Sequence, residues 1–289
     1  LQIFPHYARM KKNPATKRRI RFMEKKRFMI GVDCEGVACA VGQYGKAIGD
    51  GDNYRFAAKQ ATREANAAAK ALFDMGAEDV IVWDNHCTGV NLDYDALDPR
   101  CRILLGSGHH GRFPTVDETF GGVLFIGYHA REGSLPGVLS HTYSSVSYRW
   151  YRLNGIEMGE MQIDAAFAGK HGVPVLFAAS DDVAIAQAKE SFPWIETVET
   201  KQSLSWNSAI SLHPQRSCEL IYEGVKKACE RLDEMKPYRI AEPIDVSIAF
   251  KRPDAANQAQ LYDRNRRPFR FADAYTREGI LDQLEDLFN

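Results

Sequence analysis

The segment RFMIGVDCEG, residues 27–36, joins a short apolar run to two carboxylates, and the run indicates the fold class. Residues 28–32 carry no polar side chain, so they predict a buried strand. Similar runs recur along the chain, with segments of helical spacing between them. Strands that alternate with helices predict an α/β protein with a mostly parallel sheet and helices on both of its faces. The predicted strands are residues 27–32, 79–83, 102–105, 122–128, 174–178 and 197–201, and the predicted helices are residues 53–75, 157–170, 181–190 and 213–235.

The pattern changes after residue 137, which indicates a second, smaller unit. Residues 140–153 are rich in Tyr, Ser, Val and Trp, and Asn154-Gly155 is a strong hairpin turn signal. Residues 244–250 alternate as in a half-exposed strand, and residues 276–288 are predicted to form a final helix. We therefore divide the chain into three parts: a basic N-terminal arm (1–26), a metal-binding α/β catalytic domain (27–200) and a smaller C-terminal α/β subdomain (201–289).

The composition is that of a globular protein. Of the 289 residues, 45% are hydrophobic and 26% are charged, and these proportions exclude collagen-like and mostly disordered proteins. No apolar run approaches the ~18–20 residues that a membrane-spanning helix needs. We therefore expect no membrane partner.

The net charge of −1 conceals an uneven distribution. Residues 1–27 carry ten Lys or Arg and one acidic residue, so this segment has a charge of +9 and the remainder has a charge of −10. We favour a solvated tail that packs on a neighbouring subunit. A patch that attracts polyanions is a weaker interpretation, and a transit peptide is disfavoured because the arm has no Ser. We therefore expect no nucleic-acid partner.

Six cysteines occur at irregular spacing, without a C-x-x-C pair, and we expect no signal peptide before them. This pattern favours reduced thiols over a disulfide framework or a four-cysteine zinc site. We expect most of these thiols to be buried and the protein to be cytoplasmic.

Acidic and histidine residues follow three of the predicted strands. Asp33 and Glu35 come after the first strand, Asp84 and His86 after the second, and His129 after the strand at residues 122–128. Ligands of open α/β sheets bind where the carboxyl ends of parallel strands converge, so these side chains are expected to meet. Taken singly, each residue could cap a loop or a helix. The joint pattern instead indicates one site.

The residue types at this site suit a metal centre. Asp33 and Glu35 point to the same side of an extended chain, and two such carboxylates repel each other unless a cation or a proton neutralises them. Glu160, at the start of a helix, can add a further oxygen. Mixed imidazole and carboxylate ligands suit zinc and leave cobalt or manganese open. Because the ligands outnumber those that one catalytic zinc needs, we expect two Zn²⁺ ions per subunit, with Asp33 as the candidate bridging ligand.

A loop that contains glycine and proline separates His129 from His141 and can return His141 to the same place. His141 is therefore the candidate catalytic residue, as an acid, a base or an electrostatic stabiliser. Ser140 beside it lacks the G-x-S-x-G surroundings of a serine nucleophile. The pair His109-His110 lies between glycines and is interpreted as part of a loop near the mouth of the site.

Five motifs follow one another along the chain: DCEG (33–36), DNH (84–86), GYHAR (127–131), PGVLSH (136–141) and GE (159–160). Together they resemble the zinc-dependent D-aminopeptidase family of bacterial dipeptide-operon metallopeptidases. The resemblance implies that Asp33, Glu35, His86, His129 and Glu160 hold two zinc ions and that His141 is the catalytic histidine. It also implies a ring-shaped homo-oligomer, a decamer of stacked pentamers around an enclosed chamber. The resemblance runs from residue 28 to residue 201 and is looser in the C-terminal third.

The sequence thus predicts a dinuclear zinc aminopeptidase that cleaves the N-terminal amide of short peptides, including peptides with D-amino acids. Two alternatives stay open at this point. One is a metal-dependent hydrolase of a non-peptide amide or a phosphoester, and the other is a non-catalytic binding module with a structural metal site. Few basic residues other than Arg131 neighbour the predicted ligands, which argues against a phosphoester.

Overall fold

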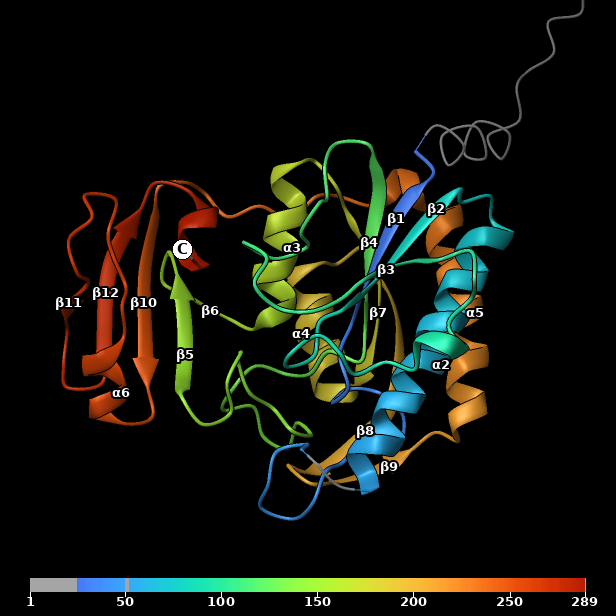
Figure 1. Ribbon diagram of the computed structural model, residues 1–289, viewed down its shortest axis with the longest axis horizontal. Helices are drawn as coiled ribbons and strands as arrows, with labels where there is room; N and C mark the ends of the chain where they lie inside the picture. The colour runs from blue at the N-terminus through green and yellow to red at the C-terminus, as the bar shows by residue number, and fades with distance from the viewer. Residues whose placement is uncertain (1–24, 50–51, 289) are drawn as a thin grey trace, which may run out of the picture.

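A seven-stranded sheet forms the larger part of the protein (Figure 1). The structure is a computed structural model that describes residues 25–49 and 52–288, so most of the basic arm lies outside the described residues. The strand order is β3-β2-β1-β4-β7-β8-β9, and all neighbours are parallel except β8 and β9. The strands are β1 (Arg27–Val32), β2 (Asp79–Asp84), β3 (Arg102–Leu104), β4 (Phe120–Ile126), β7 (Val175–Asp181), β8 (Glu196–Ser205) and β9 (Ser208–Ser211).

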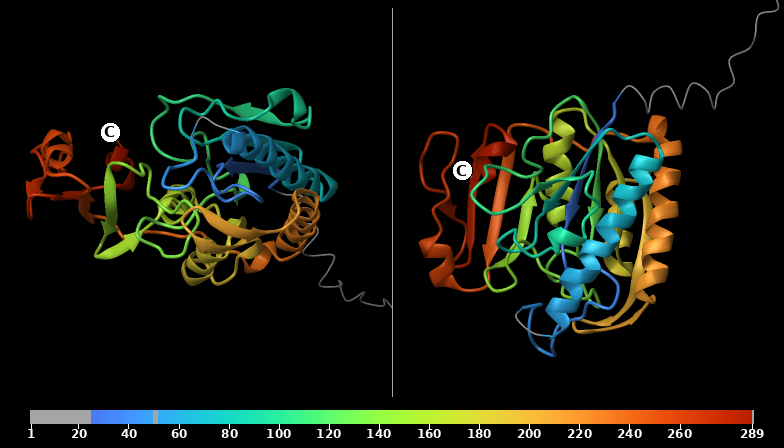
Figure 2. Two further views of the ribbon diagram at one scale, coloured as in Figure 1. Left: turned by 90° about the horizontal axis from the view of Figure 1, so that it is seen from below. Right: turned by 45° about the vertical axis from the view of Figure 1, so that its right-hand side comes forward.

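Two apolar cores cover the two faces of this sheet. Along β1, Phe28 and Ile30 face one core, whereas Met29 faces the other, because successive side chains of a strand alternate. Helices α2 (Asp52–Asp74) and α5 (Pro214–Glu230) pack side by side on the first face (Figure 2). Helices α3 (Glu160–Lys170) and α4 (Asp182–Ser191) cover the second face. The predicted parallel sheet with helices on both faces is confirmed.

A second, smaller sheet lies beyond α3 and is antiparallel. The turn between its strands β5 and β6 is the predicted Asn154-Gly155 pair, and both residues have positive φ (52° and 77°), as a tight hairpin turn requires. The sheet takes strands from both sides of residue 200, and the division at 200/201 remains a prediction. Its order is β11-β12-β10-β5-β6, with β5 (Tyr148–Leu153), β6 (Ile156–Met158), β10 (Ile244–Phe250), β11 (Arg270–Phe271) and β12 (Thr276–Leu281).

Helix α3 lies between the two sheets and is buried almost all round. Met161 and Ala165 pack on the large sheet, and Ile163 and Phe167 pack on the small one. The helix therefore joins the two layers and fixes the position of Glu160, its first residue.

The predicted final helix at residues 276–288 is wrong. Residues 276–281 form β12, which pairs with β10 from Thr276 to Leu281, and only a 3₁₀ turn, η3 (Leu284–Phe288), follows. Pairing with a strand that is distant in sequence overrides a helix-like local composition here. Residues 157 and 158, predicted as the start of a helix, belong to β6 (Ile156–Met158). The remaining elements are η1 (Tyr94–Ala96), η2 (Leu232–Glu234) and α6 (Pro253–Gln258). Within the described ranges, no helix is long and apolar enough to cross a membrane.

Candidate metal centre

The chain segments that follow β1 and β4 approach each other closely, and two glycines permit this approach. A Cβ atom at Gly36 would overlap the carbonyl oxygen of Tyr128, and one at Gly127 would overlap the carbonyl oxygen of Asp33. Gly127 also has a φ of +73°, which glycine adopts without strain. The backbone contact places the residue after β1, Asp33, next to the residues after β4, including His129.

Asp33 lies at the centre of the cluster that the strand ends form. Its Oδ1 is 2.7 Å from Nδ1 of His86, and its Oδ2 is 3.5 Å from Nε2 of His129. Oε2 of Glu35 lies 3.1 Å from the same His86 nitrogen. The structure therefore brings together side chains from the ends of β1, β2 and β4, as the strand pattern predicts.

Glu160 and His141 complete the cluster from the other side. Oε1 of Glu160 is 3.2 Å from Nε2 of His129 and 3.9 Å from Nε2 of His141. The rings of His129 and His141 are stacked, with centroids 3.8 Å apart and planes inclined by 13°. All six predicted site residues thus lie in one place. Asp33, Glu35, His129 and Glu160 are buried, and the side chains of His86 and His141 are only slightly exposed.

The carboxylate and imidazole groups of the cluster shift each other's pKa values. Burial raises the pKa of Asp33, but the hydrogen bond from His86 and the charge of His86 outweigh burial and hold that pKa far below its ordinary value. Burial disfavours a charged His86, yet Glu35 and Asp33 hold the pKa of His86 far above its usual range. Glu160, ahead of Asp33, raises the pKa of His129 to about 10 against the effect of burial. The pKa of Glu160 is lowered, because His129 outweighs burial.

Two buried atoms of the cluster lie 3.1 and 3.2 Å from another side chain of the cluster but form no hydrogen bond of good geometry within the described part of the chain. They are Oε2 of Glu35 and Nε2 of His129. Both are metal-ligating atoms, and an orphaned buried polar atom is costly unless an ion or a water satisfies it. The atoms that could bind a cation form two overlapping groups, each within 4.8 Å, and His129 belongs to both: His129, His141 and Glu160 in one, and Asp33, Glu35 and His129 in the other. The donor set therefore fits zinc, which takes imidazole and carboxylate ligands.

Lys201 is a buried residue beside the centre that the sequence pattern did not single out. Its ammonium group donates to the carbonyl oxygens of Glu35, Val37 and Ala40. Burial lowers the pKa of Lys201 to about 8, although Asp181 and Glu64 oppose this effect. The loop that carries Glu35 is thus anchored from behind by a cation that is engaged with the chain itself.

Several other predicted features have structural explanations. Asp84 accepts hydrogen bonds from the backbone N–H groups of Asn91 and Leu92, so it orders the following loop.

All six cysteines lie in the described ranges and are free, but only Cys34 and Cys229 are buried, so the expectation that most are buried is wrong. His109 packs edge-on against Trp83, with ring centroids 5.6 Å apart.

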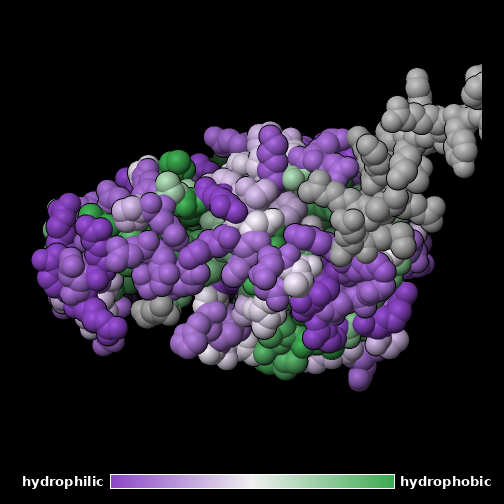
Figure 3. Space-filling view, turned by 90° about the horizontal axis from the view of Figure 1, so that it is seen from above, coloured by the Kyte–Doolittle hydropathy of each residue, from purple (hydrophilic) through white to green (hydrophobic). Residues whose placement is uncertain are grey.

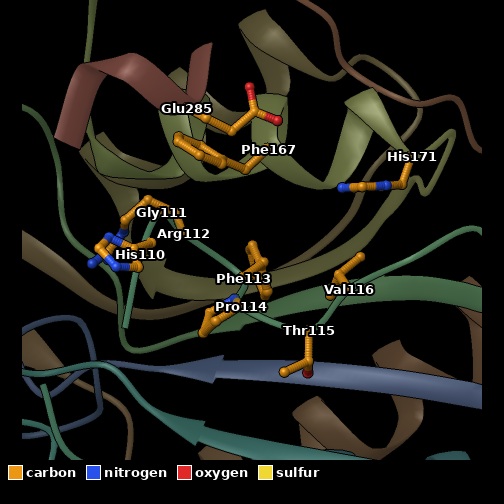
Figure 4. A pocket seen from close by; sticks show the side chains of 10 residues that line it. All are labelled: His110, Gly111, Arg112, Phe113, Pro114, Thr115, Val116, Phe167, His171 and Glu285. Atoms are coloured by element: carbon orange, nitrogen blue, oxygen red, sulfur yellow. The ribbon is translucent and has the colours of Figure 1, made fainter. Parts of the chain in front are cut away.

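A separate cavity of about 160 Å³ lies between α3 and the segment at residues 110–116. Figure 4 shows this segment along one side of the cavity and Phe167, His171 and Glu285 along the other. None of the predicted ligands lines it. The cavity is therefore distinct from the candidate metal centre.

Comparison with known proteins identifies the family to which this chain belongs. A family model described as D-aminopeptidase matches residues 27–282, so this chain belongs to the D-aminopeptidase family. A D-aminopeptidase of Bacillus subtilis (strain 168) is 35% identical over 203 residues, which are 69% of this chain and 73% of that protein. This chain is also similar to a solved structure, that of the Zn-dependent D-aminopeptidase DppA from Bacillus subtilis, a self-compartmentalizing protease. The two structures superpose with a TM-score of 0.81 at 28% identity, and the match covers 91% of this chain and 94% of that chain. The predicted family is confirmed, and the match extends through most of the C-terminal third.

Proposed function

We propose that this chain is a zinc-dependent aminopeptidase that releases the N-terminal residue of short peptides, with D-residues among its substrates. The observation that carries the proposal is the buried cluster around Asp33, in which Oε2 of Glu35 and Nε2 of His129 are buried, metal-ligating atoms without a hydrogen bond of good geometry. Membership of the D-aminopeptidase family and the likeness to a Zn-dependent relative support the choice of metal and substrate.

Two zinc ions per subunit are proposed, held by Asp33, Glu35, His86, His129 and Glu160. Five ligands exceed the three protein ligands and one water that a single catalytic zinc takes, which supports two ions rather than one. Zinc, when bound, supplies a Lewis acid that polarises the scissile carbonyl and makes water nucleophilic near neutral pH. The central position of Asp33, between His86 and His129, suits the bridging role.

His141 is proposed to move a proton or to stabilise developing negative charge. Its Nδ1 lies 2.8 Å from the carbonyl oxygen of Leu139, which can only accept, so Nδ1 carries a proton and donates it to this hydrogen bond. Nε2, on the side of Glu160, is then the atom that can take a proton from the attacking water and pass it to the departing amine, or face the oxyanion while it is protonated. The carboxylates around it can also attract the α-ammonium group of a peptide.

The nearby cations do not favour a phosphoester substrate. Lys201 donates to three backbone carbonyl oxygens, and Arg131 lies 3.8 Å from Glu157. Both groups are engaged with the chain itself. An uncharged amide carbonyl needs no such cation, which supports an amide substrate over a phosphoester.

We also propose a ring-shaped homo-oligomer, as a decamer, that encloses the sites, in keeping with the self-compartmentalizing relative. Figure 3 shows a largely hydrophilic face with separate apolar patches. Several large apolar side chains are exposed, among them Leu135 (85%), in the loop between His129 and His141, and Val146 (76%). A neighbouring subunit would bury such residues. The six free thiols support a reducing, cytoplasmic compartment.

The proposal is tested with dipeptides that begin with D-Ala or L-Ala. We expect the zinc-loaded protein to release the N-terminal residue, with a preference for D-Ala, and the Asp33→Ala variant to lose activity together with zinc. Removal of zinc with a chelator should abolish turnover, and adding zinc back should restore it. Full activity of the zinc-free wild type would overturn the mechanism.

A further inference from the structure

A closed ring of buried and partly buried polar side chains lies beside the candidate metal centre. The guanidinium group of Arg112 forms two hydrogen bonds with the carboxylate of Asp164, at 2.7 and 3.0 Å. It also donates to Oδ1 of Asn85 at 2.5 Å. Nδ2 of Asn85 donates to the hydroxyl of Tyr128 at 2.8 Å, and that hydroxyl donates to Asp164 at 2.8 Å. Each of the four residues thus binds two others of the ring.

Three residues of the ring are close to proposed ligands along the chain. Asn85 immediately precedes His86, and Tyr128 immediately precedes His129. Asp164 lies four residues after Glu160 on α3, which is about one turn of a helix. A single hydrogen-bonded unit therefore links the segments that carry His86, His129 and Glu160.

Tyr143 makes a second link between the ring and the centre. Its hydroxyl donates to Asp164 at 3.2 Å, and its backbone N–H donates to Oε1 of Glu160 at 2.7 Å. The Arg112 guanidinium lies over the rings of Trp83 and Tyr143, 4.8 and 5.2 Å from their centroids. The charge is thus enclosed by aromatic faces as well as by hydrogen bonds.

The backbone that follows Arg112 adopts an unfavourable conformation. Phe113 and Thr115 have positive φ values of 47° and 73°, and a β-branched residue such as Thr rarely adopts this region. Asp164 is completely buried, and a buried ion pair is a poor source of net stability compared with apolar packing. Strained backbone and buried charge together are typical of a functional constraint.

We propose that Arg112 is a positioning residue that holds His86, His129 and Glu160 in the relative arrangement that binds zinc. It acts through Asn85, Tyr128 and Asp164 and touches neither metal nor substrate. This inference rests on the proposed function, because it takes these three residues to be zinc ligands. Outer partners that orient metal ligands commonly contribute 10–100-fold to metal affinity.

The test compares full-length Arg112→Ala, Arg112→Lys and Asp164→Asn with Arg277→Ala. Arg277, in β12 of the second sheet, is the control, because it is an arginine at least as buried as Arg112 but donates to the backbone carbonyl oxygens of Phe269 and Ala256. Zinc affinity is measured by competition with a chromogenic chelator, and the visible spectrum of the Co²⁺-substituted protein reports ligand geometry. Circular dichroism establishes that each variant is folded.

We expect the Arg112 and Asp164 variants to bind zinc about 10–100-fold more weakly and to show an altered Co²⁺ spectrum. Lysine keeps the charge but lacks the planar fork, so Arg112→Lys is expected to be impaired as well. Arg277→Ala should lose stability yet keep wild-type zinc affinity. If Arg112→Ala fails to fold, Arg112→Lys and Asp164→Asn test the positioning role.

Wild-type zinc affinity and an unchanged Co²⁺ spectrum in folded Arg112→Lys and Asp164→Asn would overturn the positioning role. An equal loss of zinc affinity in Arg277→Ala would also overturn it, because the loss would then follow stability alone. A wild-type protein that binds no zinc would contradict the proposed function itself.

Discussion

His141 lies with its imidazole ring flat against that of His129, and the same side chain has two possible roles. Its Nε2 is close enough to Glu160 to share a cation with it, since His141 belongs to one of the two groups of candidate ligands. Its hydrogen bond to the carbonyl of Leu139 leaves Nε2 free for proton transfer. We propose the catalytic role, and a substitution can distinguish it from a role as a metal ligand.

We predict that His141→Ala lowers kcat by about 10²–10⁴-fold, the usual contribution of a positioned acid or base. Its zinc content should match that of the wild type, because the five proposed ligands are intact. Steady-state kinetics on a D-Ala dipeptide and metal analysis of the same sample make the measurement. His171→Ala, at the far end of α3, serves as the control and should retain activity. Loss of zinc from His141→Ala would make His141 a ligand instead.

At the scale of elements, the close crossing after β1 and β4 is the feature on which the site depends. Gly127→Ala places a methyl group against the Asp33 carbonyl and also strains a φ of +73°. We predict a loss of about 3 kcal/mol in the free energy of unfolding, together with weaker zinc binding. Chemical denaturation measures the first and chelator competition the second.

Gly155 is the matched control for this prediction. It has a similar φ of +77°, but no atom lies within 4 Å of a Cβ added there. Gly155→Ala should therefore cost only the backbone strain, about 1 kcal/mol, and leave zinc affinity unchanged. Equal losses in the two variants would contradict the importance of the crossing.

Asp79, the first residue of β2, ties three neighbouring strands together. It accepts hydrogen bonds from Arg27 of β1 at 3.0 Å and from Arg102 of β3 at 2.8 Å. Burial raises the pKa of Asp79, but the two arginines outweigh burial and lower it below its ordinary value of 3.8. Because the folded-state pKa is the lower one, the stabilisation is present above about pH 4 and is lost as the pH falls through the folded-state value.

We predict that Asp79→Asn lowers the free energy of unfolding by about 1 kcal/mol at pH 7, since the arginines are partly exposed. The difference from the wild type should shrink as the pH falls below about 4. Urea denaturation at a series of pH values measures it, with the exposed Asp95→Asn as control. A difference that grows on acidification would contradict this assignment.

At the scale of the whole molecule, the sequence predicts most of the large sheet and the composition of the site. Apolar runs such as residues 27–32 are local signals, and topology places their carboxyl ends together, so Asp33, His86 and His129 could be found from the sequence. The partner of a strand is not a local signal, which is why residues 276–281 were mistaken for helix. Arg112 and Asp164 were missed for a related reason. Their importance depends on burial and on each other, and single charged residues in a sequence indicate neither.

The zinc content of the purified wild-type chain, measured by metal analysis against protein concentration, tests the central claim most directly. Asp33→Ala, which lacks the proposed bridging ligand, is measured alongside. We predict about two zinc ions per wild-type chain and a clear loss of zinc from Asp33→Ala. An active wild-type protein without zinc, or Asp33→Ala with an undiminished zinc content, would contradict the account.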